Sequence, residues 1–112
     1  MALPDYVEFV VRDTERSKKF YATLFGWPFT DYGPGYTSFE GPQLSGGFTT
    51  EGTPKPGGPL VIFYVADLEG AFAKAQTAGA KITKEIFSFP GGRRFQCLDP
   101  DGYEISAWSD PL

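Results

Sequence analysis

The sequence of 112 residues contains no histidine and only one cysteine. Imidazole is the commonest general base and the usual ligand for zinc, iron and nickel. Without it, any proton transfer depends on Asp, Glu, Tyr or Lys, and any metal depends on carboxylates, hydroxyls or backbone carbonyls. The single cysteine, Cys97, excludes an internal disulfide and gives no indication of secretion.

Long apolar runs and concentrated positive charge are also missing. The longest apolar stretch, 60–66, is too short to span a bilayer, and residues 1–5 lack the basic and apolar regions of a signal peptide. The net charge is −4 and the basic residues are scattered, whereas binding to a phosphate backbone needs a concentrated positive field. We therefore expect a cytoplasmic protein with neither membrane nor nucleic acid as a partner.

Aromatic residues, by contrast, are plentiful. Eleven Phe, six Tyr and two Trp make up 17% of the chain. This is more than one small core usually needs, so we expect some of these rings to line a cavity or an interface.

The chain repeats itself: residues 6–13 align with residues 60–67, an offset of 54. Val, Phe and Val recur at alternate positions, as residues that share one face of a strand must. Each strand then reaches an Asp, Asp13 or Asp67, that is suited to cap a helix. Amphipathic stretches follow, and Gly26 and Gly79 are suited to end the two helices.

Short strand-like runs separated by turn residues follow each predicted helix. They cover 27–30, 36–40 and 47–50 in the first half, and 81–87, 94–98 and 103–108 in the second. This order predicts an α+β fold with tandem βαβββ modules. We expect one domain over 1–112, with module 1 at about 4–51, a Gly- and Pro-rich linker at 52–59 and module 2 at about 60–110.

The two faces of the repeated strands differ in character. The matched positions carry Val7, Phe9 and Val11 in the first half, and we expect them to pack under the helices. The alternate positions, which include Glu8, differ between the halves, and a core would not tolerate an unpaired charge. We therefore expect a ligand cavity on this second face.

Two motifs resemble the glyoxalase/bleomycin resistance protein/dioxygenase (vicinal oxygen chelate) superfamily. Residues 13–27, with Phe20-Tyr21 and Phe25-Gly26-Trp27, are similar to the family's first helix, and Asp99-Pro-Asp-Gly102 is similar to its closing turn. The resemblance covers essentially the whole chain. It implies curved mixed sheets that form a cup-shaped cavity, often completed in a homodimer, and enzymes that hold a divalent metal.

Carried over by position, the family's metal ligands fall on Tyr6, Leu60, Ser106 and Phe48. Leu and Phe cannot bind a cation, and neutral Tyr and Ser bind hard cations weakly. We therefore predict no metal ligand and no cofactor, although a weakly held divalent ion remains an alternative. The resemblance then does not extend to lactoylglutathione lyase activity or to ring-cleaving dioxygenase chemistry.

Two carboxylates are candidate catalytic or ligand-binding groups. Glu8 shares a strand face with Tyr6 and is suited to act as a general base, while Glu104 shares a face with Ser106. Either could instead be a structural or surface carboxylate. Arg93 and Arg94 are interpreted as a solvated turn, with contact to an anionic ligand as the alternative. The candidate ligand-binding residues are Tyr6, Phe48, Leu60, Ile62, Tyr64, Gln96, Ser106 and Trp108.

Three functions follow from the resemblance and these residues. The first is binding of a small organic molecule in an aromatic-lined cavity without the usual metal. The second is a lyase or isomerase that uses Glu8 as its base, with a weakly held metal or none. The third is a drug-sequestering protein of the bleomycin-resistance kind, whose aromatic walls enclose a bulky cation. A small-molecule ligand and a second copy of the chain are the expected partners.

Overall fold

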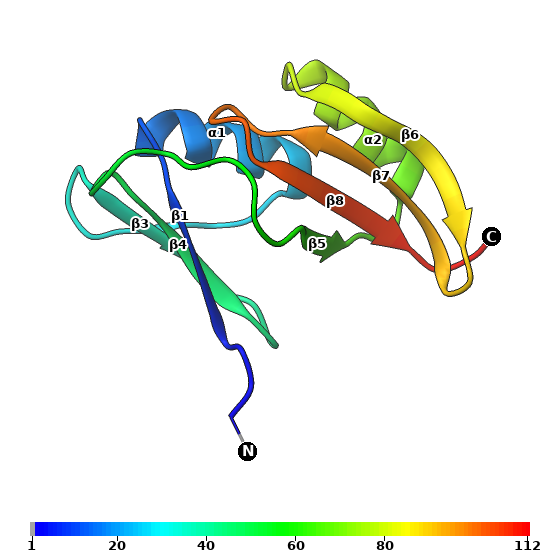
Figure 1. Cartoon of the computed structure of the whole chain (residues 1–112), viewed down its shortest axis with the longest axis horizontal. Coiled ribbons are helices and arrows are strands. Elements are labelled where there is room, and N and C mark those ends of the chain that lie inside the picture. The colour runs from blue at the N-terminus through cyan, green and yellow to red at the C-terminus, as the bar shows by residue number, and fades with distance from the viewer. Residues whose placement is uncertain (1) are drawn as a thin grey trace.

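The computed structural model describes residues 2–112 and contains two four-stranded sheets, each with one helix (Figure 1). The first module contains β1 (Tyr6–Val10), α1 (Thr14–Phe25), β2 (Thr30–Asp31), β3 (Tyr36–Phe39) and β4 (Ser45–Thr49). The second contains β5 (Val61–Tyr64), α2 (Leu68–Thr77), β6 (Lys81–Phe89), β7 (Gly92–Leu98) and β8 (Glu104–Ser109). The predicted α+β fold with two βαβββ modules is confirmed.

The two sheets have the same topology. Their strand orders are β1-β4-β3-β2 and β5-β8-β7-β6. The first strand of each module lies at the edge and pairs in parallel with the last strand, and the remaining pairs are antiparallel. The internal repeat thus extends from the sequence to the hydrogen-bonding pattern.

Both helices begin at the predicted caps. The Asp13 carboxylate accepts a hydrogen bond from the backbone N–H of Glu15 (3.0 Å), and Asp67 accepts one from Gly70 (3.0 Å). Helix α1 ends at Gly26, whose φ of 77° is left-handed, a conformation that favours glycine. No helix within residues 2–112 is long and apolar enough to cross a bilayer.

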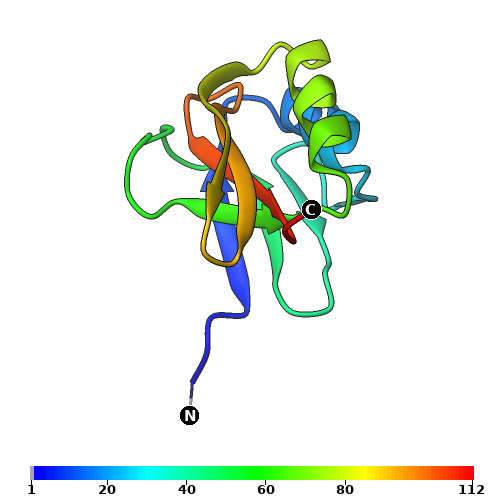
Figure 2. The ribbon, with the colours of Figure 1, turned by 90° about the vertical axis from the view of Figure 1, so that its right-hand side faces the viewer.

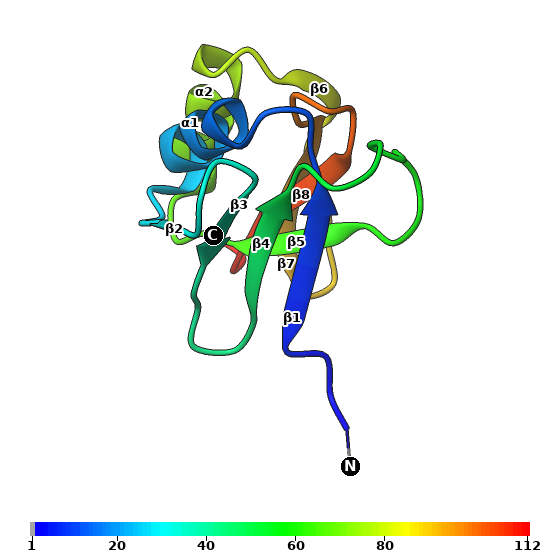
Figure 3. The ribbon, with the colours of Figure 1, turned by 90° about the vertical axis from the view of Figure 1, so that its left-hand side faces the viewer.

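The helices and both sheets share one core that is rich in aromatic rings. Figures 2 and 3 show the two helices together on one side of the molecule and the strands on the other. Tyr21 of α1 stacks on Trp27 (5.2 Å between ring centroids) and on Phe48 of β4 (5.1 Å). Phe63 of the second module packs against Phe25 of the first (4.7 Å). Many of the aromatic residues therefore hold the modules together, and Phe25, Trp27 and Phe63 also border the groove between them.

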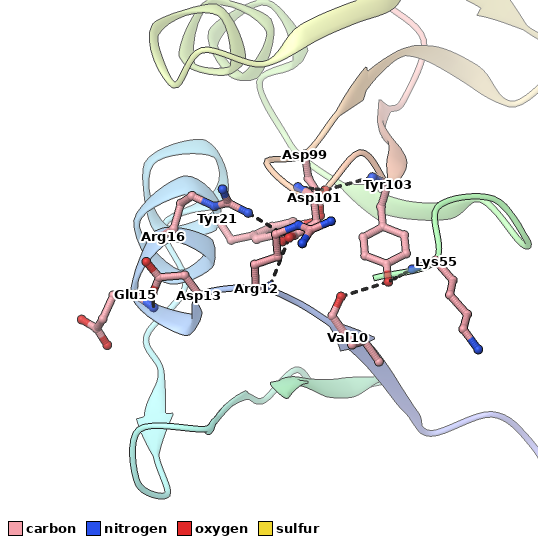
Figure 4. A network of polar contacts seen from close by, with 10 residues as sticks. All are labelled: Val10, Arg12, Asp13, Glu15, Arg16, Tyr21, Lys55, Asp99, Asp101 and Tyr103. Atoms are coloured by element: carbon pink, nitrogen blue, oxygen red, sulfur yellow. Dashed lines mark hydrogen bonds and ion pairs between the residues drawn. The ribbon is translucent and has the colours of Figure 1, made fainter. Parts of the chain in front are cut away.

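Polar contacts fasten the closing turn of the second module to the first module (Figure 4). Asp99 accepts hydrogen bonds from the buried Tyr21 hydroxyl (2.8 Å) and from the backbone N–H groups of Asp101 (2.9 Å) and Tyr103 (3.0 Å). The Tyr103 hydroxyl donates to the Val10 carbonyl (2.9 Å). The two motifs that carry the family resemblance are therefore in direct contact.

Burial dominates the electrostatics of this contact. It raises the pKa of the Asp99 carboxyl, although the hydrogen bonds from Tyr21, Tyr103 and Asp101 act in the opposite direction. Burial and the neighbouring Asp99 charge also raise the pKa of the Tyr21 phenol well above its usual value. The phenol therefore stays protonated and remains the donor in this bond.

Candidate functional site

Each sheet packs one face on the core and leaves the other face open. Phe9 is buried, whereas Glu8, on the opposite face of β1, is exposed. In β5, Phe63 packs against the core, while Ile62 and Tyr64 are 43% and 55% exposed. The matched repeat positions thus pack under the helices, as expected. We call the uncovered faces of the sheets β1-β4-β3-β2 and β5-β8-β7-β6 the first and the second open face.

Two phenols and a carboxylate form a hydrogen-bonded chain on the first open face. The Tyr36 hydroxyl donates to the Glu8 carboxylate (2.9 Å) and shares a hydrogen bond with the Tyr6 hydroxyl (2.5 Å). The strand between them carries Gly47, the register partner of Glu8. A Cβ at Gly47 would collide with the Tyr36 hydroxyl and lie 2.7 Å from the Tyr6 hydroxyl. The absence of a side chain at Gly47 therefore lets the phenols cross β4.

The surroundings of Tyr36 keep it a hydrogen-bond donor. Desolvation, with the bonds to Tyr6 and Glu8, raises its pKa far above neutral pH. Tyr6 and Tyr36 also line a shallow hollow of about 460 Å³, together with Glu40 and Ser45. One oxygen of Glu8 is thus held by Tyr36, and this oxygen makes the carboxylate's one hydrogen bond among the described residues. The other oxygen can accept a hydrogen bond from a ligand.

The second open face carries a row of aromatic and cationic side chains. The strand register places Tyr64, Trp108, Arg94 and Phe87 beside one another across β5, β8, β7 and β6. The Tyr64 and Trp108 rings meet edge to face at 5.0 Å. The Arg94 guanidinium lies 5.3 Å from the centroid of the Phe87 ring and 5.7 Å from that of Phe89, within cation–π range.

A second row on this face is polar, and most of its polar groups already form hydrogen bonds within the chain. The Ser106 hydroxyl donates to the Phe95 carbonyl (2.9 Å). The Gln96 amide nitrogen donates to Glu104 (3.0 Å), and Thr83 donates to the same carboxylate oxygen (2.6 Å). These bonds lower the pKa of Glu104. Glu104 therefore orients Gln96 as an ionised acceptor, a role that does not suit a general base.

Phe48 lies on the opposite face from the one we expected. It is fully buried in the core, because β4 pairs Phe48 with Phe9 and pairs Gly47 with Glu8. In the second module, Ile62 at the position equivalent to Glu8 pairs with Ser106. The counterpart of Ser106 in the first module is therefore Gly47. Our prediction placed this counterpart one residue later, at Phe48.

The remaining predicted residues do not gather in one cavity of the single chain. Ile62, Tyr64 and Trp108 line a groove of about 880 Å³ that runs between the modules, beside the β3–β4 loop. Leu60 and Glu104 instead border a small hollow of about 90 Å³. No hydrogen bond within residues 2–112 joins Glu104 to Glu8. Glu8 and Glu104 lie in different sheets, on β1 and β8.

The donor groups of the chain do not fit a divalent metal. The described residues contain no group of three or more His, Cys, Asp or Glu side chains that could hold one. Glu8 is bonded to Tyr36, and Glu104 is bonded to Thr83 and Gln96. Neutral Tyr6 and Ser106, at the family's ligand positions, are weak ligands for hard cations. The carboxylates therefore do not rebuild the family's metal site.

Sequence reasoning missed two parts of these faces. Tyr36 was not singled out, although it alternates with Thr37, whose side chain is fully buried. Phe87 and Phe89 alternate with Ser88 in the same way at the end of β6. In both cases the period-2 pattern indicates a shared face, but only the strand register shows what that face meets.

Comparison with known proteins agrees with this fold. A sequence model of the Glyoxalase/Bleomycin resistance protein/Dioxygenase superfamily matches residues 3–107. A Mycobacterium tuberculosis protein named "Putative glyoxylase CFP32" is 28% identical over 118 residues, which cover 94% of this chain and 44% of that protein. The chain thus spans less than half the length of this relative.

Two solved structures illustrate the likeness in fold. A glyoxalase-related enzyme from Fulvimarina pelagi superposes with a TM-score of 0.84 at 18% identity, covering 100% of this chain and 91% of that one. A glyoxalase/bleomycin resistance protein from Albidiferax ferrireducens T118 gives a TM-score of 0.79 at 25% identity, covering 98% and 100% of the two chains.

Proposed function

Because the chain belongs to the glyoxalase/bleomycin resistance protein/dioxygenase superfamily, we propose that it binds a small organic molecule on its open sheet faces, through side chains and without a divalent metal. The hydrogen-bonded chain from Tyr6 through Tyr36 to Glu8 carries this proposal. It spans three strands on an exposed face, and it depends on the missing side chain of Gly47. Solvation of a surface needs no such arrangement, whereas recognition of a ligand does.

The geometry suits a ligand that donates a hydrogen bond. Tyr36 holds one Glu8 oxygen and leaves the other facing solvent, while the exposed Tyr6 hydroxyl stands at the end of the chain. A hydroxyl, amide N–H or ammonium group can bind the free Glu8 oxygen. A charge-assisted hydrogen bond of this kind contributes roughly 1.5–3 kcal/mol.

A lyase or isomerase activity is the second candidate, and the Tyr36–Glu8 bond favours it. A general base needs a fixed orientation and access to the proton it removes. Tyr36 supplies the orientation, and exposure supplies the access. In this reading Glu8 removes a proton from the bound substrate, and the protonated Tyr36 hydroxyl stabilises the carboxylate between turnovers.

We also propose that two copies of the chain complete the site. In one chain the polar group at Glu8 and the aromatic row at Trp108 lie on different sheets. A homodimer that places the first open face of one copy against the second open face of the other would enclose both. The mass in solution, measured by analytical ultracentrifugation, is then expected at twice the 12.3 kDa of the chain.

The test is a thermal-shift screen followed by calorimetric titration, on protein treated with a chelator. The screen contains neutral, anionic and cationic aromatic compounds. Each hit is titrated into the parent protein, Glu8→Gln and the control Glu51→Gln, which changes an exposed carboxylate outside both open faces. We expect Glu8→Gln to weaken binding about tenfold or more, and Glu51→Gln to have no effect.

The outcomes separate the two candidates. A binding protein loses affinity in Glu8→Gln, whereas an enzyme loses turnover of a hit while its affinity changes less. Binding that requires added nickel, zinc or manganese would contradict the metal-free proposal. Unchanged binding of every hit by Glu8→Gln would exclude the Tyr6–Tyr36–Glu8 chain from the site.

A further inference from the structure

Two consecutive arginines on β7 have opposite surroundings. Arg93 points to the helix side of its sheet and forms a two-fold ion pair with Glu69 of α2, at 2.5 and 3.1 Å. Arg94 points to the second open face and stands over the rings of Phe87 and Phe89. Its side chain makes no ion pair or hydrogen bond among residues 2–112. The sequence-based interpretation of both as a solvated turn is therefore wrong, because both lie within β7.

The carboxylates around Arg94 are already bonded elsewhere. Glu104 accepts from Thr83 and Gln96, and Asp110 accepts from the Tyr64 hydroxyl (2.5 Å). A second cation, Lys84, also lies over the Phe87 ring, at 5.6 Å. This part of the second open face therefore carries two cations on an aromatic surface, and neither forms an ion pair among residues 2–112.

A buried acceptor lies beside Arg94. Gln96 is only 5% exposed, and its Oε1 is buried without a hydrogen-bond partner in the described structure. Its orientation is fixed, because its Nε2 must face the Glu104 carboxylate. A buried acceptor without a partner is unfavourable, and a hydrogen-bond donor of a ligand that displaces the side chains covering Oε1 would pair it.

From these contacts we infer that the second open face binds an aromatic carboxylate, with the carboxylate on Arg94, a hydroxyl on Gln96 and the ring against Trp108. Arg94 and Gln96 lie two residues apart on one strand face, with their Cα atoms roughly 7 Å apart along the strand, so one ligand can contact both side chains. This inference rests on the proposed function, since it assigns the chemical class of the ligand.

The experiment follows the two tryptophan indole N–H signals by NMR during titration. Trp108 is on the open face, whereas Trp27 packs against the core and lines the groove between the modules, so a shift of Trp27 would report binding in that groove. The probes are 3-hydroxybenzoate, benzoate and the neutral 3-hydroxybenzamide. The variants are Arg94→Gln and the matched control Arg93→Gln, which removes the same charge from the opposite face. Thermal unfolding of each variant verifies that it is folded.

We expect 3-hydroxybenzoate to shift Trp108 but not Trp27, and to bind more tightly than benzoate and 3-hydroxybenzamide. Arg94→Gln should weaken this binding about tenfold or more, and Arg93→Gln should leave it unchanged. Equal binding of the acid and the amide, or unchanged binding by Arg94→Gln, would overturn the inference. Aromatic binding without a preference for carboxylates would overturn it while leaving the proposed function intact. If none of the three probes binds, this inference fails, and the thermal-shift screen decides the proposed function separately.

Discussion

The two open faces have the same strand topology and opposite chemistry. On the first, the missing side chain of Gly47 makes room for a hydrogen-bonded chain from Tyr6 through Tyr36 to the Glu8 carboxylate. On the second, Arg94 and Lys84 stand on aromatic rings. The core faces of β1 and β5, by contrast, both carry Val and Phe at matched positions. Packing under a helix restricts the side chains of a duplicated module, whereas its uncovered face is free to acquire a different ligand chemistry.

Removing the contact between the two halves should have the largest effect. Asp99→Ala leaves the buried Tyr21 hydroxyl and the N–H groups of Asp101 and Tyr103 without their acceptor. We expect the free energy of unfolding to fall by about 3–5 kcal/mol, because each unpaired buried group costs about 1–3 kcal/mol. Urea denaturation measures the loss. A loss below about 1 kcal/mol would show that the Asp99 hydrogen bonds contribute little to holding the modules together.

Asp99→Asn keeps the shape of the side chain and removes its charge, which gives a pH test of the same contact. The folded-state pKa of Asp99 is raised, so the native protein binds its proton more readily than the unfolded chain. Stability that depends on this proton is lost as pH rises through the folded-state pKa. The parent protein should therefore gain stability relative to Asp99→Asn as pH falls from 7 towards the ordinary Asp range. An unchanged difference would contradict the raised pKa.

Gly47→Ala should have an intermediate effect, and it should alter the first open face alone. The added methyl displaces both phenols, and overpacking of this kind costs about 1–3 kcal/mol. Ultraviolet titration should show the pKa of Tyr36 returning towards its usual value as its bond to Glu8 is lost. Because the proposed dimer brings both faces into one site, the displaced phenols should also weaken binding of 3-hydroxybenzoate, whereas Ser38→Ala, on the same face, should not. Unchanged binding by Gly47→Ala would show that the first open face lies outside the site.

The smallest effect is expected at Cys97, which lies under the second open face on the core side. Burial raises the pKa of the Cys97 thiol to about 12. At pH 8 the thiolate is then scarce, and alkylation should run roughly a thousandfold slower than in the unfolded chain. Mass spectrometry after brief exposure to iodoacetamide should find the native protein unmodified. Rapid labelling would show that this sheet opens readily.

Local signals in the sequence were sufficient to predict the elements of this fold. The Asp13 cap and the Gly26 stop bound α1 as expected, and the linker separates two modules with the same element order. The strand predicted at 27–30 begins later, since β2 covers only Thr30–Asp31, while Trp27 and Phe29 pack against the core. These are properties of short segments, which capping, periodicity and turn residues determine.

The candidate site was less predictable, because it depends on contacts between distant strands. The bond between Tyr36 and Glu8 joins residues 28 positions apart through the register of β1, β4 and β3. The prediction placed the family's ligand position on Phe48 instead of Gly47, one residue away, and therefore assigned a buried core residue to the ligand face. The surroundings of Arg94 likewise depend on the pairing of β6 with β7, which places Phe87 beside it. Register determines which side chains meet, and a single sequence does not reveal it.

The bond between Tyr21 and Asp99 has a consequence for how the chain is made. It joins residues 78 positions apart, and the bond from Tyr103 to Val10 spans 93 positions. While the chain emerges from the ribosome, all four strands of the first module and α1 are available long before Asp99 is synthesised. The hydrogen bonds from Tyr21 to Asp99 and from Tyr103 to Val10 therefore form only after the closing turn of the second module has been synthesised.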